Sequence, residues 1–260
     1  KVCDPAMGSG AFLVEACRQL GDALVEAWTV HHETPLLPPD EDPVLHARRM
    51  VAQKCLYGVD KNPFAVNLAK LSLWLVTLAK DHPFTFLDHA LKHGDSLVGL
   101  TKRQIGRFDW QSDDTNLPSL LAWIEKQTAS AKDHRANVQN AGDGDDVSQR
   151  LEWLEAEDAV EPARIAGDLC IAAFFAADKD KAREEKRREY KDLIGRWRAG
   201  EAQALVDVAV IRDGLRRGER PVVPFHWEVE FPEVFDRNNG GFDAAVGNPP
   251  FAGKNTLAAS

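Results

Sequence analysis

A short segment near the end of the chain combines an amide side chain, two prolines and an aromatic ring in the order Asn248-Pro-Pro-Phe251. The prolines fix the backbone and remove two N–H donors, so the local carbonyl groups are acceptors only. Acceptors beside a flat apolar ring suit a planar group that carries an NH2. Alone, the segment could equally be a rigid loop without a chemical role. The expected strand before it and the motifs upstream favour the chemical interpretation.

A glycine-bearing turn lies at the start of the chain, Asp4-Pro-Ala-Met-Gly8-Ser-Gly10. Gly8 and Gly10 permit a tight turn and a close approach of a ligand to the backbone. The helix expected next would direct free N–H groups and its positive dipole end at that place, which suits a phosphate or a carboxylate. The turn lacks the Lys of a Walker loop and the third glycine of a dinucleotide motif. An ordinary strand-to-helix turn is the alternative.

Two further carboxylates, Asp60 and Asp95, lie at the ends of expected strands. Asp60 could accept hydrogen bonds from both hydroxyls of a ribose, or it could be the N-cap of the next helix. Asp95 could accept from an adenine amino group, or it could cap a turn. With the glycine turn, three strand ends then carry Asp or Gly, which suits a nucleoside with a charged tail.

The apolar pattern predicts the elements that would hold these residues. We expect strands at 1–4, 55–60 and 90–93, a helix from Ala11, a loop over 34–43, a helix over 44–54 and a helix beginning at Asn62-Pro63. The residues expected to face inward on this last helix are Phe64, Leu68, Leu71, Leu75 and Leu78. Parallel strands present their carboxyl ends at one edge of a sheet, and α/β sheets bind ligands there.

The middle of the chain, from Asn116 to about Gly214, has helical periodicity and strong charge, with a polar linker expected over 137–146. Its run Lys186-Arg187-Arg188 is either a solvated helix face or a contact to a DNA backbone. Alternating apolar residues then predict a strand over 225–231, and an apolar run predicts a last strand over 242–246. This order indicates a parallel α/β sheet with a helical insertion.

Composition limits the classes of protein that need to be considered. The 260 residues are 44% hydrophobic and 28% charged, which is ordinary for a globular protein and excludes collagen-like or wholly disordered chains. A net charge of −9 argues against a protein that coats DNA, although a local basic patch remains compatible with it. The four cysteines form no C-x-x-C pair, so we expect inert thiols. The first residue is Lys and the motifs lie close to both ends, so we expect a piece of a longer protein.

The motifs together resemble those of class I S-adenosylmethionine-dependent methyltransferases, and more narrowly of N6-adenine DNA methyltransferases of the gamma arrangement. The matching segments are Asp4-Pro-Ala-Met-Gly-Ser-Gly-Ala-Phe-Leu13, Leu56-Tyr-Gly-Val-Asp-Lys-Asn-Pro-Phe-Ala65, His93-Gly-Asp-Ser-Leu97 and Phe242-Asp-Ala-Ala-Val-Gly-Asn-Pro-Pro-Phe251. Trp227-Glu-Val-Glu-Phe-Pro-Glu-Val-Phe235 resembles the segment before the last motif in type IIG restriction–methylation proteins and in BREX and DISARM phage-defence methyltransferases. The resemblance covers residues 1–100 and 225–255.

The resemblance implies a role for each matching residue. Contacts to the cofactor would come from Asp4, Ala6, Met7, Gly8, Ser9 and Gly10 at the methionine moiety, Asp60 at the ribose, Lys61 and Asn62 near the adenine, and Asp95 and Ser96 at the adenine edge. The target-base site would consist of Asn248, Pro249, Pro250 and Phe251, with no metal. One departure is Met7, where relatives usually have a small residue or cysteine.

The resemblance also implies a fold, a reaction and a setting. The fold would be a Rossmann-like parallel sheet, of which this chain holds strands 1–4, with the first and fourth as neighbours. The domains would be a cofactor-binding half at 1–100, a helical insertion at 101–224 and a return to the sheet at 225–260. S-adenosylmethionine would methylate a flipped adenine in double-stranded DNA, in the cytoplasm of a bacterium or archaeon, with restriction or defence subunits as further partners and no membrane.

Three alternatives to this reaction stay open. They are a methyltransferase acting on RNA, one acting on a glutamine side chain of a protein, and a non-catalytic scaffold of the same fold. We further expect the 260-residue piece to be inactive and poorly soluble when expressed alone.

Overall fold

The computed structural model describes the chain except residues 40, 78–86, 111–118, 141–145 and 250–260. It divides into two compact units, each described by itself below. The sheet unit comprises Lys1–His93 and Phe242–Ser260, and the helical unit comprises Gly94–Gly241. Residues 225–241, which we grouped with the last strand, therefore belong to the helical unit. In the described residues, no helix is long and apolar enough to span a bilayer.

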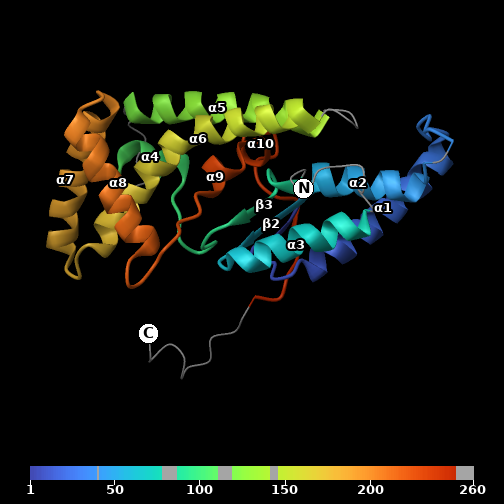
Figure 1. Ribbon diagram of the computed structural model, residues 1–260, viewed down its shortest axis with the longest axis horizontal. Helices are drawn as coiled ribbons and strands as arrows, with labels where there is room; N and C mark the ends of the chain where they lie inside the picture. Colours follow the sequence, from blue (N-terminus) through green and yellow to red (C-terminus); the bar gives the residue numbers. More distant parts are fainter. Residues whose placement is uncertain (40, 78–86, 111–118, 141–145, 250–260) are drawn as a thin grey trace, which may run out of the picture. The chain divides into compact units, whose positions relative to one another are not determined.

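The sheet unit contains parallel strands in the order β3-β2-β1-β4 (Figure 1). Their bounds are β1 Val2–Asp4, β2 Leu56–Asp60, β3 Leu91–His93 and β4 Ala244–Ala245. β1 and β4 are neighbours, as the family resemblance implied, in the register Val2↔Ala244 and Cys3↔Ala245. β4 is shorter than the strand expected over 242–246. The expectation of a parallel α/β sheet is confirmed.

Three helices surround this sheet, and they begin close to where the sequence placed them. They are α1 Ala11–His31, α2 Pro43–Cys55 and α3 Pro63–Val76. α3 begins at Pro63 with Asn62 as its N-cap, whose side chain accepts from the Phe64 amide at 3.0 Å. The segment between α1 and α2 is a loop over its described residues, as expected.

The inward face predicted for α3 is wrong. Phe64 is 80% exposed, and Leu68, Leu71 and Leu75 are also exposed, while Leu78 lies outside the described residues. The buried positions are Val66, Ala69 and Leu73. Ala69 decides the orientation, because a Cβ built on Gly10 would lie only 3.0 Å from the Ala69 Cβ. The glycine turn and the helix approach so closely that only small residues fit between them, and the larger leucines face outward.

The helical unit consists of helices (Figure 1), most of which contribute side chains to an apolar cluster. Their bounds are α4 Lys102–Arg107, α5 Ser119–Asn140, α6 Asp146–Phe175, α7 Asp180–Arg198, α8 Ala202–Arg217, α9 Trp227–Glu230 and α10 Pro232–Phe235. The helical interpretation of the middle of the chain is confirmed for its described residues. The linker expected over 137–146 is wrong at both ends, because α5 extends to Asn140 and α6 begins at Asp146, while residues 141–145 lie outside the described residues.

The strand predicted over 225–231 is wrong, because Trp227–Glu230 is the short helix α9. Trp227 and Phe231 are four residues apart, which fits one helical turn as well as it fits alternation along a strand. The Phe231 amide donates to the Trp227 carbonyl at 3.0 Å, and both rings pack against Phe225. Glu230 receives a bidentate pair from Arg164 on α6, which fixes α9 as a helix against α6.

A buried ionic cluster ties α6, α8 and α9 together within the helical unit. Asp168 is fully buried and accepts from Arg212 Nε at 2.7 Å and from Arg216 Nε at 2.9 Å. His226 Nδ1 accepts from the Leu100 amide at 3.0 Å, which leaves the ring proton on Nε2, 3.5 Å from Asp168 Oδ1. Burial alone would raise the pKa of Asp168, but His226 and Arg216 hold that pKa below its ordinary value.

The basic run on α7 pairs mainly within its own helix. Lys186 pairs with Glu189, while Arg187 and Arg188 both pair with Glu184. Pairs at a spacing of three or four residues are the usual arrangement of a solvated helix face. This geometry favours the solvated-face interpretation over a contact to a DNA backbone.

Candidate functional site

The glycine turn is tied to the end of β2 by one backbone hydrogen bond and closed by another. The Met7 amide donates to the Val59 carbonyl at 3.0 Å, and the Gly10 amide donates to the Met7 carbonyl at 2.8 Å. Gly8 and Gly10 have φ angles of 53° and 80°, a left-handed backbone that glycine adopts without strain. Gly10 is the N-cap of α1 and has no side chain to cap it, so the helix start offers its N–H groups without a side-chain acceptor.

Asp60, at the end of β2, holds this turn with its carboxylate. Oδ2 accepts from the Gly8 amide at 2.8 Å, and Oδ1 accepts from the Asn62 amide at 2.7 Å. The alternative that Asp60 is the N-cap of the next helix is wrong, because Asn62 fills that position. A carboxylate has about four lone-pair sites, so acceptor capacity remains on Asp60 for further donors.

Asp4 is the most unusual polar residue of the sheet unit. Its side chain is 1% exposed, and Oδ1 accepts from the Ala6 amide at 3.0 Å. In the part of the chain that the structure describes, the buried Oδ2 has no hydrogen-bond partner. Burial raises the pKa of Asp4, and the nearby charge of Asp60 raises that pKa further. An unpaired, buried carboxylate oxygen costs stability, and it marks a place where a donor or a cation would be favourable.

The residues before Asn248 lie directly against Asp4. The Val246 amide donates to the Cys3 carbonyl at 2.9 Å, which continues the alignment of β4 with β1. A Cβ built on Gly247 would lie 2.5 Å from Asp4 Oδ1, so only glycine permits this approach. Asn248 and Pro249 follow and are exposed, whereas Pro250 and Phe251 lie outside the described residues. The structure thus brings Asp4 together with the start of the Asn-Pro-Pro-Phe segment.

Met7 contributes to the core rather than presenting its side chain at the surface of the turn. Its side chain is 3% exposed, and a Cβ on Gly58 would meet its sulfur at 2.3 Å. Only the backbone of Met7 is therefore available at the turn. Ser9 is exposed and lines a cavity of about 450 Å³ between α1 and α3, to which Asp4 and Asp60 do not contribute.

Asp95 and Ser96 belong to the helical unit, where both take part in a turn. Asp95 Oδ1 accepts from the Leu97 amide at 3.1 Å, so Asp95 caps a turn, as one of its two interpretations expected. The Ser96 carbonyl accepts from the Trp227 indole at 3.0 Å. The proposed contact of Asp95 and Ser96 to an adenine stays a prediction.

One residue near the site escaped the sequence reasoning. His93 ends β3 and is exposed, and its Nε2 lies 3.0 Å from the Lys61 carbonyl. This contact links the ends of β2 and β3 on the loop that carries Asp60, Lys61 and Asn62. A histidine as the last residue of a short strand was the available signal, and no spacing rule made it stand out.

The cysteines are consistent with inert thiols. Cys3, Cys17 and Cys170 are buried, and burial raises the pKa of each to about 12. A thiol with so high a pKa stays protonated at neutral pH and is a weak nucleophile. Cys55 is half-buried and is also free.

Three curated proteins show what the chain is similar to. A putative type II restriction enzyme and methyltransferase, RM.MjaORFECS2P of Methanocaldococcus jannaschii, is 21% identical over 294 aligned positions that cover 96% of this chain and 22% of the relative. The type II restriction enzyme and methyltransferase RM.Eco57I of Escherichia coli is 30% identical over 110 positions, covering 38% of this chain and 11% of that protein. The adenine-specific methyltransferase PglX of Streptomyces coelicolor is 32% identical over 142 positions, covering 52% of this chain and 10% of that protein. No solved structure matches the chain.

The family comparison covers most of the chain. The model of the Eco57I restriction-modification methylases matches residues 54–260, which include β2, β3, the helical unit, β4 and the Asn-Pro-Pro-Phe segment. The glycine turn lies before this range, inside the longer alignment with the Methanocaldococcus jannaschii protein. The chain spans less than a quarter of the length of the curated relatives it matches. On the match of its residues 54–260, the chain belongs to the Eco57I restriction-modification methylase family.

Proposed function

We propose that the protein transfers a methyl group from S-adenosylmethionine to the N6 amino group of a flipped adenine in DNA, within a restriction-modification or phage-defence system. One observation carries this proposal. Gly247, directly before the Asn-Pro-Pro-Phe segment, approaches the carboxylate of Asp4 as closely as a glycine can. A donor bound at the glycine turn and an acceptor bound at Asn248 would then be neighbours, which direct transfer between two substrates requires.

The described residues fit a cofactor with a zwitterionic amino-acid end and a nucleoside. The unpaired Oδ2 of Asp4 suits an ammonium group, because this buried acceptor otherwise has no donor. A Cβ on Gly8 would meet nothing within 4 Å, so there is open space at that point of the turn. Asp60 would accept from the ribose hydroxyls with its remaining lone pairs. The other proposed contacts are those of Ala6, Ser9, Gly10 and the Met7 backbone to the methionine moiety, and of Lys61, Asn62, Asp95 and Ser96 to the adenine.

The acceptor chemistry would belong to the Asn-Pro-Pro-Phe segment. When bound, the cofactor supplies an electrophilic methyl group on a sulfonium centre. The Asn248 side-chain oxygen and the Pro249 carbonyl would accept the two N6 hydrogens, which directs the nitrogen lone pair toward that methyl group and stabilises the positive charge that grows on the amine. Phe251 would stack on the flipped base, which is worth about 1–3 kcal/mol and offsets part of the cost of flipping.

The experiment offers DNA, RNA and protein side by side to the purified full-length parent of this chain, with methyl-labelled S-adenosylmethionine. We expect label in DNA, on N6-methyladenine identified by mass spectrometry after nuclease digestion. Label in RNA alone, or on glutamine side chains alone, would support one of the alternatives. No label in any acceptor, with cofactor binding retained, would support a non-catalytic scaffold.

The matched variants are Asn248→Ala and, as a control, Asn67→Ala, which removes an exposed asparagine from α3. We expect Asn248→Ala to lower turnover by about two to three orders of magnitude, because it removes one preorganised acceptor. Cofactor affinity should be unchanged in calorimetry, since the residue faces the acceptor. Turnover within a few-fold of the unmodified protein would contradict the proposed role of Asn248.

A further inference from the structure

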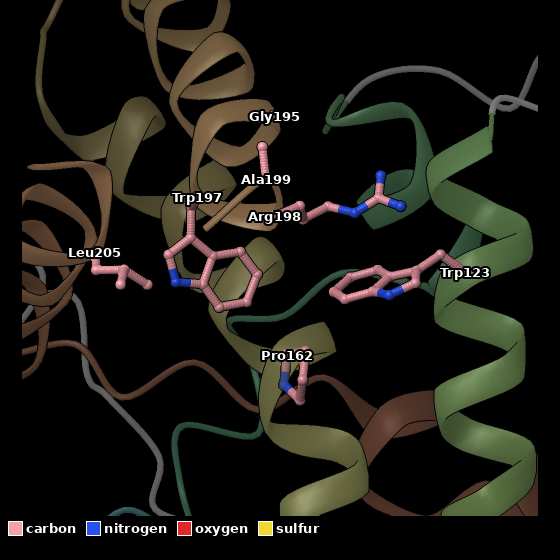
Figure 2. A pocket seen from close by; sticks show the side chains of 7 residues that line it. All are labelled: Trp123, Pro162, Gly195, Trp197, Arg198, Ala199 and Leu205. Carbon is pink, nitrogen blue, oxygen red and sulfur yellow. The ribbon is translucent and has the colours of Figure 1, made fainter. Parts of the chain in front are cut away.

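A second cavity lies entirely within the helical unit, and none of its lining residues is among those assigned to methyl transfer. Its volume is about 500 Å³, and it is lined by parts of α5, α6, α7 and the start of α8. Figure 2 shows its main features, Trp123 and Trp197 from two different helices, Arg198 beside them and Pro162 on the opposite side. A cavity of this size is within the range that holds a small organic ligand.

The two tryptophans give the cavity flat aromatic walls. Their ring centroids are 6.3 Å apart at an interplanar angle of 81°, so the rings meet nearly at right angles. Both side chains are half-buried, which means that one part of each ring packs on the core while another part faces the cavity. Two perpendicular indoles cannot enclose a ring between them, but each offers a surface on which one planar ring can stack.

Arg198 adds a positive charge at the same place. Its guanidinium carbon lies 4.6 Å from the centre of the Trp123 ring, and in the described part of the chain no carboxylate pairs with it. The contrast with Arg196, which pairs with Glu201 at 3.2 Å, is clear. A guanidinium that stacks on an indole keeps its N–H donors free in its own plane, where they can bind an anion in bidentate fashion.

The wall opposite Arg198 contains Pro162 of α6. Pro162 lies inside α6 and has no N–H, so it cannot donate the helical hydrogen bond to the carbonyl of Asp158, one turn earlier. The nearby carboxylate of Glu161 is already paired with Arg164 and Arg212 and does not cancel the charge of Arg198. The cavity therefore combines aromatic stacking surfaces with the guanidinium of Arg198, which pairs with no carboxylate of the described residues.

We propose that this cavity binds an unpaired nucleotide, with its base on a tryptophan ring and its phosphate on Arg198. Bases stack on aromatic side chains regardless of sequence, and arginine is well suited to phosphate. A methylated ammonium ligand, which also favours tryptophan walls, would be repelled by Arg198. The nucleotide could come from a displaced strand of the DNA substrate or from the free nucleotide pool, and the two sources share this chemistry.

The test uses Arg198→Ala, with Arg196→Ala as the control that removes the same charge from the same helix outside the cavity. The probe is a fluorescein-labelled oligothymidylate, whose binding to the purified protein is followed by anisotropy. It contains no adenine, so the acceptor proposed at Asn248 has no target in it. We expect Arg198→Ala to weaken binding at least about fivefold and Arg196→Ala to change it less than about twofold.

A second pair of variants tests the stacking surface. We expect Trp197→Leu to weaken binding as much as Arg198→Ala does, and Trp197→Phe to retain most of it, because phenylalanine keeps an aromatic face. Thermal melts accompany each variant. If Trp197→Leu lowers the melting temperature strongly, Arg198→Ala and Trp197→Phe decide the result, since Arg198 is exposed and phenylalanine conserves the packing.

A third measurement, calorimetry with thymidine monophosphate, distinguishes the sources. Oligothymidylate binding that depends on Arg198 supports a strand of nucleic acid as the occupant. Dependence seen with thymidine monophosphate alone supports a free nucleotide. The proposal is overturned if neither ligand responds to Arg198→Ala, or if Arg196→Ala weakens binding equally. Methylation by the protein is a separate readout, so the failure of one proposal does not imply the failure of the other.

Discussion

Replacing Asp4 by asparagine should make the protein without cofactor more stable. Asp4 is 1% exposed, and its Oδ2 is buried without a partner in the described residues. Asparagine removes the charge, keeps the Oδ1 position that accepts from the Ala6 amide, and has nearly the same shape. A buried unsatisfied acceptor costs about 1–3 kcal/mol, and the cost is larger when the acceptor is charged. The new amide group would itself lack an acceptor, which offsets part of the gain from removing the charge. We therefore expect a net gain of about 1 kcal/mol, which for a chain of this size is a rise in melting temperature of about 2–4 °C.

The gain should depend on pH in a defined direction. Burial, helped by the charge of Asp60, raises the pKa of Asp4 above its ordinary value of 3.8. Asp4 thus takes up a proton more readily in the folded state than in the unfolded state. Above the raised pKa the carboxylate is charged, and its burial lowers the free energy of unfolding. As the pH falls through that raised value the cost disappears, so the variant and the unmodified protein should melt alike near pH 3.8. The difference between them, rather than either melting temperature, is the quantity to follow.

The assay is a set of thermal melts from neutral pH downward, with Asp60→Asn as the matched control. Asp60 accepts from two backbone amides, so the loss of its charge should destabilise the protein at neutral pH. With S-adenosylmethionine added, the unmodified protein should melt at a higher temperature than Asp4→Asn, because it gains a bond to the ligand that the variant lacks. An Asp4→Asn variant less stable than the unmodified protein at neutral pH, or a difference that ignores pH, would refute the reasoning.

Three further predictions follow from the two units. Asp60→Ala should weaken S-adenosylmethionine binding by about 1.5–3 kcal/mol through lost charge-assisted hydrogen bonds, and unchanged affinity in calorimetry would remove Asp60 from the site. Phe251→Ala should weaken binding of the flipped base more than Phe251→Trp does; equal 2-aminopurine fluorescence at the target position in both variants would contradict stacking. Gly167→Ala should destabilise the helical unit by about 1–3 kcal/mol, because its Cβ would lie 2.4 Å from His226 Nε2. The control, Gly214→Ala, has open space and should stabilise α8 slightly, so equal melting shifts would argue against the contact.

The parts of the fold that the sequence predicts correctly depend on local signals. A proline after an asparagine marks the start of α3, and glycines that need a left-handed backbone mark the turn before α1. Buried strands with a carboxylate at their ends are equally local. Their neighbour order came from the family resemblance, and β1 and β4 do pair as it implied.

The errors arise where two local patterns fit and a distant contact decides between them. α3 has two apolar stripes, one of large and one of smaller residues. The contact between Gly10 and Ala69 buries the stripe of smaller residues, and the pattern of apolar residues within the helix does not indicate this choice. Likewise, Trp227 and Phe231 fit a strand or a helical turn, and Arg164 on another helix fixes the turn by pairing with Glu230. The members of the site could be predicted from local motifs, but the close approach of Gly247 to Asp4 joins residues that are far apart in the sequence.

The pairing of β1 with β4 has a consequence for the order of events during synthesis. Val2 and Ala244 are about 240 positions apart, and the whole helical unit is encoded between β3 and β4. At about 5–20 residues per second, β1 leaves the ribosome with this edge unpaired for about 10–50 s. During that interval the glycine turn, β2 and β3 can assemble, while the segment that carries Asn248 does not yet exist. The position against Asp4 is therefore filled last, and a ribosome that stalls in the helical unit leaves β1 open to pairing with another chain.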